Sequence, residues 1–129
     1  MFFNQLELNH IGVIVAKDDF ERIATSKNCE LIEDKIQGVR VFFELNTILQ
    51  AQIEYIAQEG RVANAAIGYN HSCYNIKDQQ HLDRLHNMMK DTKTGFRLTF
   101  PERSAAREYC NLVAFYKTIY GIVEFNIVN

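Results

Sequence analysis

Two stretches of the chain repeat one another: residues 9–23 read NHIGVIVAKDDFERI and residues 70–85 read NHSCYNIKDQQHLDRL. Both begin with Asn-His, continue through an alternating apolar stretch to Lys-Asp, and then turn into a helix-like segment. The two halves also end alike, with IEYI at residues 53–56 and VEFNI at residues 123–127. A sequence that repeats itself predicts two similar structural units in succession.

The expected secondary structure follows the same duplication. In the first half we expect strands over residues 8–15, 30–34, 39–45 and 49–56, with a helix from Asp18 or Asp19, as its cap, to about residue 26. In the second half we expect strands over residues 69–76, 96–100, 112–117 and 122–128, with a helix over 78–90. The order βαβββ therefore occurs twice. We predict one α+β domain over residues 1–129, with module 1 at about 6–57 and module 2 at about 67–129.

Composition sets broad limits on function. Hydrophobic residues make up 47% of the 129 residues and charged residues 23%, as in ordinary globular proteins. A formal net charge of −2, with no run of Lys or Arg, disfavours nucleic acid and membrane surfaces as partners. No apolar stretch is long enough for a membrane span, and the start resembles no signal peptide, so we expect a cytoplasmic protein. Three widely spaced cysteines predict neither a disulfide framework nor a cysteine-based zinc site.

Strand alternation places a histidine and a glutamate on one face in each half. Residues of equal parity share a face of a strand, so His10 lies opposite the apolar side of the first strand and Glu54 lies opposite that of the fourth. His71 and Glu124 occupy the corresponding positions of the second half. A single histidine or glutamate on a strand is usually structural or solvated. The recurrence of both residue types with consistent parity favours a functional site.

These four residues predict a metal site if the sheet curls into a cup around a cavity. Two imidazoles and two carboxylates suit a divalent ion with open positions, and such a mixture favours Mn, Fe, Co, Ni or Zn. His81 and His86, on the second helix, do not follow the pattern and are expected to face solvent. The charged cluster at residues 102–108 is expected in a loop or short helix at the rim of the cavity.

The segments NHIGVIVAKD, IEYI, GYNHSCYNIKD and GIVEFNIV together resemble the four ligand-bearing strands of a known superfamily. This is the vicinal oxygen chelate superfamily, which includes glyoxalase I, methylmalonyl-CoA epimerase, bleomycin resistance proteins and extradiol dioxygenases. The resemblance covers nearly the whole chain. It implies a glyoxalase-like fold of paired βαβββ modules, a metal bound by His10, Glu54, His71 and Glu124, and a homodimer.

The resemblance implies a function by analogy only, because one fold hosts many reactions. It suggests a metal-dependent isomerase, epimerase or lyase that removes a proton next to a carbonyl of a small carbonyl or acyl-thioester substrate. Glu124 is the candidate base. Gln37-Gly38-Val39 resembles a stretch of the epimerases, which carry a further glutamate three residues after the glycine. This chain has Val41 there, within the apolar face formed by Val39, Val41 and Phe43.

Two other functions stay open from the sequence. The apolar face suits a protein that binds a small molecule without chemistry, as resistance proteins of the superfamily do. An iron dioxygenase would use His10, His71 and Glu124 as a two-histidine, one-carboxylate set. For any of these functions, the candidate substrate-binding residues are Gln52, Asn75, Tyr116, Val41 and Phe43.

Overall fold

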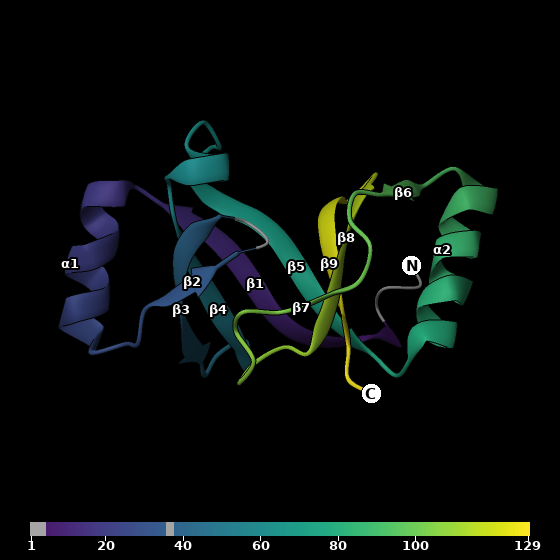
Figure 1. Ribbon diagram of the computed structural model, residues 1–129, viewed down its shortest axis with the longest axis horizontal. Coiled ribbons are helices and arrows are strands. Elements are labelled where there is room, and N and C mark those ends of the chain that lie inside the picture. The colour runs from purple at the N-terminus through teal and green to yellow at the C-terminus, as the bar shows by residue number, and fades with distance from the viewer. Residues whose placement is uncertain (1–4, 36–37) are drawn as a thin grey trace. The chain divides into compact units, whose positions relative to one another are not determined.

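The computed structural model describes residues 5–35 and 38–129, and Figure 1 shows its elements. It divides into two compact units. The first unit is His10–Asn70, and the second unit consists of His71–Asn129 together with the N-terminal residues up to Asn9. The boundaries differ slightly from those of the predicted modules, because residues before His10 belong to the second unit. Gln37, part of the epimerase-like stretch, lies outside the described residues.

The first unit holds a mixed sheet with the strand order β2-β3-β4-β1. Its elements are β1 (Glu7–Val15), α1 (Lys17–Lys27), β2 (Ile32–Asp34), β3 (Val39–Asn46), β4 (Ala51–Ala57) and the short helix η2 (Gly60–Val62). Strand β1 runs parallel to β4, while β3 is antiparallel to both β2 and β4. Phe20 and Ala24 of α1 pack with Phe42 and Ala57 in an apolar core on one face of this sheet.

The second unit repeats this plan with the strand order β5-β9-β8-β6. Its elements are β5 (Gly68–Ile76), α2 (Gln79–Thr92), β6 (Gly95–Arg97), β7 (Glu102–Arg103), β8 (Leu112–Thr118) and β9 (Gly121–Ile127). Strand β5 is parallel to β9, and β8 is antiparallel to β9, β6 and β7. Leu82, Leu85 and Met89 of α2 pack against β8 and β9 in the core of this unit. The predicted βαβββ order is confirmed in the first half, and in the second half it recurs with one additional short strand, β7.

Several local details differ from the sequence expectations. Helix α1 begins at Lys17 after Ala16, so neither Asp18 nor Asp19 is its cap. Both lie in the first turn, where their negative charge interacts favourably with the positive end of the helix dipole. Strand β4 begins at Ala51, because Gln50 has φ +53° and ends the preceding turn. Helix α2 agrees with its prediction, and the Asp78 side chain accepts a hydrogen bond from the His81 amide at 2.9 Å.

Two short elements were not predicted. Glu102–Arg103, expected in a loop or short helix, forms β7, and Gly60–Val62 forms η2. Strand β6 stops at Arg97, because the Leu98 and Thr99 amides both donate to the Phe115 carbonyl, which ends the regular ladder. Among the described residues, none of the helices has both the length and the apolar character that crossing a membrane requires.

Candidate metal centre

In the first unit, His10 and Glu54 form a buried pair. Strand β1 presents His10 and strand β4 presents Glu54, and the two strands are in parallel register, with Gly12 beside Glu54. The His10 Nε2 atom lies 3.5 Å from Glu54 Oε1, and the residues are 1% and 3% exposed. The Phe43 ring meets the His10 ring edge to face, with centroids 5.3 Å apart. An apolar ring therefore packs against the histidine of this polar pair.

In the second unit, His71 and Glu124 repeat this arrangement. His71 Nε2 lies 3.1 Å from Glu124 Oε1, and the residues are 0% and 5% exposed. The Phe115 ring meets the His71 ring at 5.4 Å between centroids. Phe115 is in register with Glu124, as Phe43 is with Glu54. The sequence repeat thus gives each unit the same set of histidine, glutamate and phenylalanine.

Each pair has the donor chemistry and spacing that a divalent ion requires. Metal–ligand bonds to imidazole nitrogen and carboxylate oxygen are about 2.1 Å long, so two neighbouring ligands of one ion stand roughly 3.0–3.4 Å apart. The N–O separations of 3.5 and 3.1 Å are close to this range, and the shorter one is also a hydrogen bond between His71 and Glu124. Burying a carboxylate is costly without a compensating positive charge, which a metal would supply. The residues of each unit therefore fit a metal; that both pairs share one ion in one cavity stays a prediction.

Four of the predicted substrate-binding residues share a face with these pairs. On β3, Val41 and Phe43 have equal parity, and both are buried. On β4, Gln52 shares the parity of Glu54 and is partly exposed. On β5, Asn75 shares the parity of His71. Their role in binding a substrate stays a prediction.

Asn75 belongs to a network of amide side chains in the second unit. Its Oδ1 atom accepts hydrogen bonds from Asn9 Nδ2 and Asn126 Nδ2, each at 2.9 Å. Asn126 Oδ1 in turn accepts a hydrogen bond from the backbone N–H of Asn111 at 2.7 Å. Asn9 Nδ2 also donates to the Tyr109 carbonyl at 3.0 Å. These bonds fix the loop before β8 to β5, β9 and the N-terminal end of β1.

Tyr116, predicted to bind substrate, lies on the opposite face of β8 from Phe115, so the structure does not place it on the face that carries His71 and Glu124. Phe115 faces His71, and alternation turns Tyr116 into the core beneath α2, where it is fully buried. Its hydroxyl oxygen accepts hydrogen bonds from Arg97 Nε at 3.1 Å and Nη2 at 2.9 Å, and lies 2.9 Å from His86 Nδ1. His86 therefore contacts the core and does not simply face solvent. Burial raises the pKa of Tyr116, and Arg97 opposes this shift.

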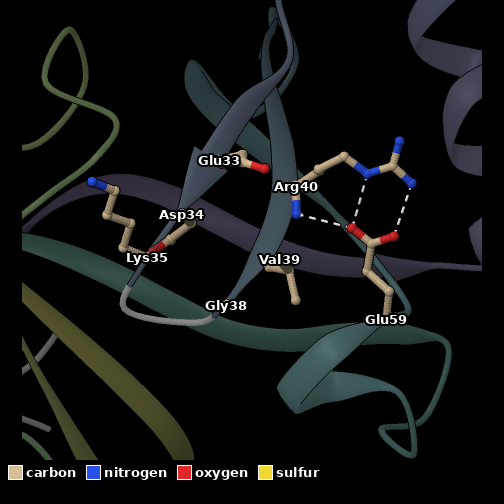
Figure 2. A pocket seen from close by; sticks show the side chains of 7 residues that line it. All are labelled: Glu33, Asp34, Lys35, Gly38, Val39, Arg40 and Glu59. Carbon is tan, nitrogen blue, oxygen red and sulfur yellow. Dashed lines mark hydrogen bonds and ion pairs between the residues drawn. The ribbon is translucent and has the colours of Figure 1, made fainter.

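A separate cavity of about 360 Å³ lies in the first unit at the β2–β3 hairpin. Figure 2 shows Arg40 paired there with Glu59: Arg40 Nε donates to Oε2 at 2.9 Å and Nη2 to Oε1 at 2.8 Å. This pairing lowers the pKa of Glu59. The lining residues are Glu33, Asp34, Lys35, Gly38, Val39, Arg40 and Glu59. None of the predicted site residues is among them, and the charges of the lining largely cancel.

Comparisons with known proteins bear on the fold. No family model and no curated protein matches the sequence. The hypothetical protein BH1468 from Bacillus halodurans C-125 matches with a TM-score of 0.65 and 20% identity, covering 97% of this chain and 96% of that one. Methylmalonyl-CoA epimerase from Mycobacterium tuberculosis matches with a TM-score of 0.61 and 16% identity, covering 94% and 87%.

A Streptomyces coelicolor methylmalonyl-CoA epimerase variant, solved in complex with 2-nitronate-propionyl-CoA, is also similar. Its TM-score is 0.59 and its identity 17%, with 94% of each chain covered. At such identities the likeness concerns the fold. The resemblance read from the four sequence segments is thus confirmed at that level: this chain has the glyoxalase-like α+β fold that the methylmalonyl-CoA epimerases also have.

Proposed function

We propose that this protein is a metal-dependent isomerase, epimerase or lyase that removes a proton next to the carbonyl of a small carbonyl or acyl-thioester substrate. His10, Glu54, His71 and Glu124 would together bind one divalent ion, of Mn, Fe, Co, Ni or Zn. The observation that carries the proposal is the repeated buried pair, with N–O separations of 3.5 and 3.1 Å. The epimerases of the same fold, crystallised with acyl-CoA ligands, support the substrate class.

The ion would polarise the substrate carbonyl and stabilise the negative charge that develops when the neighbouring C–H bond breaks. Glu124 would accept that proton and return it to the carbon, since its carboxylate is buried on the proposed ligand face of β9. Phe115, in register with Glu124 and edge-on to His71, would exclude water from this carboxylate. Gln52 and Asn75 would orient the substrate, and Val41 and Phe43 would contact its apolar part.

The metal is tested by elemental analysis of the purified protein after reconstitution with each candidate ion. We expect about one ion per chain in the parent, and at least a roughly tenfold loss of affinity in His71→Ala and Glu124→Gln, because each removes a ligand. His81→Ala and Glu102→Gln are matched controls that remove the same groups away from the proposed ligands, and both should keep the metal. Absence of metal from the reconstituted parent would refute the proposal.

The chemistry is tested by exchange of solvent deuterium into 2-oxo acids and acyl thioesters. The metal-loaded parent should label the carbon next to the carbonyl, and Glu124→Gln should abolish labelling even at metal concentrations that saturate it. Oxygen consumption with Fe(II) and no labelling would point to a dioxygenase instead.

The homodimer and the cytoplasmic location stay predictions. Sedimentation equilibrium of the purified protein tests the homodimer.

A second candidate function is binding of a small molecule without chemistry. The observation that favours it is the buried apolar pair Val41 and Phe43 on β3, the strand next to β4, which carries Glu54. By the resemblance to the epimerases, those enzymes carry a further glutamate at the position of Val41. A protein of this kind would bind metal and ligand but label no substrate. The deuterium-exchange assay separates the two functions, because a binder labels no substrate. For a binder, calorimetric titration with apolar small molecules should show weaker binding in Val41→Glu than in the parent.

A further inference from the structure

Cys73 breaks the symmetry between the two units. In the first unit, Gly12 is the residue in register beside Glu54, so no side chain projects there. In the second unit the equivalent position beside Glu124 is Cys73, which is completely buried. A thiol thus stands next to the carboxylate in one unit only, and the proposed metal set does not use it.

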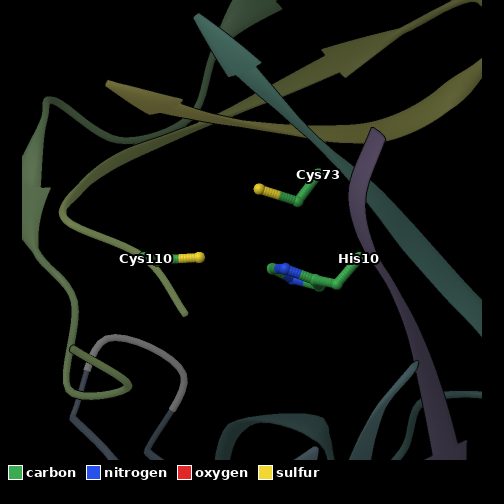
Figure 3. A group of neighbouring side chains, drawn as sticks. All are labelled: His10, Cys73 and Cys110. Atoms are coloured by element: carbon green, nitrogen blue, oxygen red, sulfur yellow. The ribbon is translucent and has the colours of Figure 1, made fainter. Parts of the chain in front are cut away.

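A second buried thiol lies close to it in the same unit. Cys110 is 4% exposed, and its Sγ atom lies within 4.8 Å of Cys73 Sγ. Figure 3 shows both thiol groups directed into the space between β5 and the loop before β8. The Cys110 thiol donates to Asn9 Oδ1 at 3.6 Å, which orients it on this side. The two sulfur atoms are therefore neighbours by tertiary structure, since 37 positions separate them along the chain.

The loop that carries Cys110 is short, and two backbone hydrogen bonds lie within it. The Ser104 amide donates to the Asn111 carbonyl at 2.8 Å, and the Cys110 amide donates to the Ala106 carbonyl at 2.9 Å. A disulfide requires sulfur atoms about 2.05 Å apart. Closing the remaining gap requires rotation of the two side chains and a shift of this loop, and Cys110 lies outside the strands.

We propose that Cys73 and Cys110 form a redox-active dithiol, which hydroperoxides oxidise to a disulfide. The Cys110 sulfur attacks one peroxide oxygen, the O–O bond breaks, and the thiol proton passes to the leaving oxygen, which gives a sulfenic acid and water or an alcohol. The Cys73 sulfur then attacks the sulfenic sulfur and the S–O bond breaks, so that the sulfenic hydroxyl leaves as water with the Cys73 thiol proton. The two thiols lose two electrons in all, and the peroxide gains them. The proposal does not depend on the proposed function or on a bound metal.

The test is peptide mapping of the full-length protein after treatment with hydrogen peroxide. Remaining thiols are alkylated under denaturing conditions, and trypsin then places Cys73 in the peptide of residues 62–77, Cys110 in 108–117 and Cys29 in 28–35. We expect a cross-linked pair of 62–77 with 108–117, which a thiol reductant releases. Recovery of both peptides alkylated, oxidised to sulfinic acid, or linked to 28–35 would overturn the proposal.

Variants and stability give an independent readout. Cys29→Ser, the matched control, should keep the cross-link, whereas Cys73→Ala should lose it and accumulate a sulfenic acid that a dimedone probe labels at Cys110. Closing a loop of this length should raise the unfolding midpoint of the oxidised parent by about 5–10 °C, reversibly with reductant. A lower midpoint than that of the reduced protein would show that the native fold does not accommodate the bond, and would also overturn the proposal.

Discussion

Replacing Tyr116 by Phe distinguishes the structural role of this residue from the substrate-binding role that the sequence suggested. The substitution keeps the ring in the core beneath α2 and removes only the hydroxyl. That hydroxyl accepts two bonds from the Arg97 guanidinium, at 3.1 and 2.9 Å, and lies 2.9 Å from His86 Nδ1. A hydrogen bond to a charged group contributes about 1.5–3 kcal/mol to stability.

The net cost should be smaller than the gross value, because Arg97 and His86 are partly exposed and water can replace the lost partner. We therefore expect the free energy of unfolding to fall by about 1–2 kcal/mol, or roughly 4–8 °C in the thermal midpoint for a chain of this size. The assay is urea denaturation followed by circular dichroism. Tyr55→Phe is the control, since the Tyr55 ring keeps its stack on Phe42 at 4.7 Å and its loss of a hydroxyl should cost little.

Alkaline pH adds a second readout for the same variant. The pKa of Tyr116 in the folded protein is raised above its ordinary value of 10.0, chiefly by burial. Its contribution to stability is therefore fully present below pH about 10 and is lost as pH rises through the folded pKa. Tyr116→Phe should lack this alkaline loss. A stability change below about 0.5 kcal/mol, or a fall in metal content as large as in Glu124→Gln, would refute the structural role.

The other predictions concern stability. Glu59→Gln should destabilise the protein by about 1–3 kcal/mol at pH 7, because it breaks the bidentate ion pair with Arg40. The difference in stability between parent and variant should vanish as pH falls through the lowered pKa of Glu59. Urea denaturation at pH values from 7 to 3 measures this difference. Gly60→Ala should cost more than about 1 kcal/mol by thermal melting, since φ is +53° and a Cβ would lie 2.3 Å from the Gly38 carbonyl oxygen; an unchanged midpoint would contradict this. Leu82→Ala, in the core of the second unit, should cost about 2–5 kcal/mol in the same melting assay, and a loss under 1 kcal/mol would mean that the core collapses around the cavity.

Alternation predicted the faces of some strands and failed on others for a physical reason. His10 and Glu54 could be placed because each stands among apolar residues of opposite parity, so one polar residue marks the face. Strand β8 reads LVAFYKT, and both of its faces are buried, so its pattern carries no such mark. The register of Phe115 with Glu124 and the packing of Tyr116 beneath α2 show which face holds Tyr116.

The contacts of Arg97 and His86 with Tyr116 join residues 19 and 30 positions apart. Likewise, Asn75 and Asn126 read as ordinary strand residues, and only their tertiary contacts show an amide network. Local propensity does not encode such long-range polar bonds. The element order, by contrast, was predictable, because each half has its own turn residues and apolar periodicity.

The division of strand β1 has a consequence for how the chain folds as it is synthesised. Asn9 belongs to the second unit, and its side chain bonds to Asn75 and Tyr109, 66 and 100 positions later. The contacts within His10–Asn70 can form as soon as Asn70 has been made. The bond of Asn9 to Tyr109 can form only after Tyr109 has been made. These contacts of Asn9 therefore form later in synthesis than the contacts within His10–Asn70.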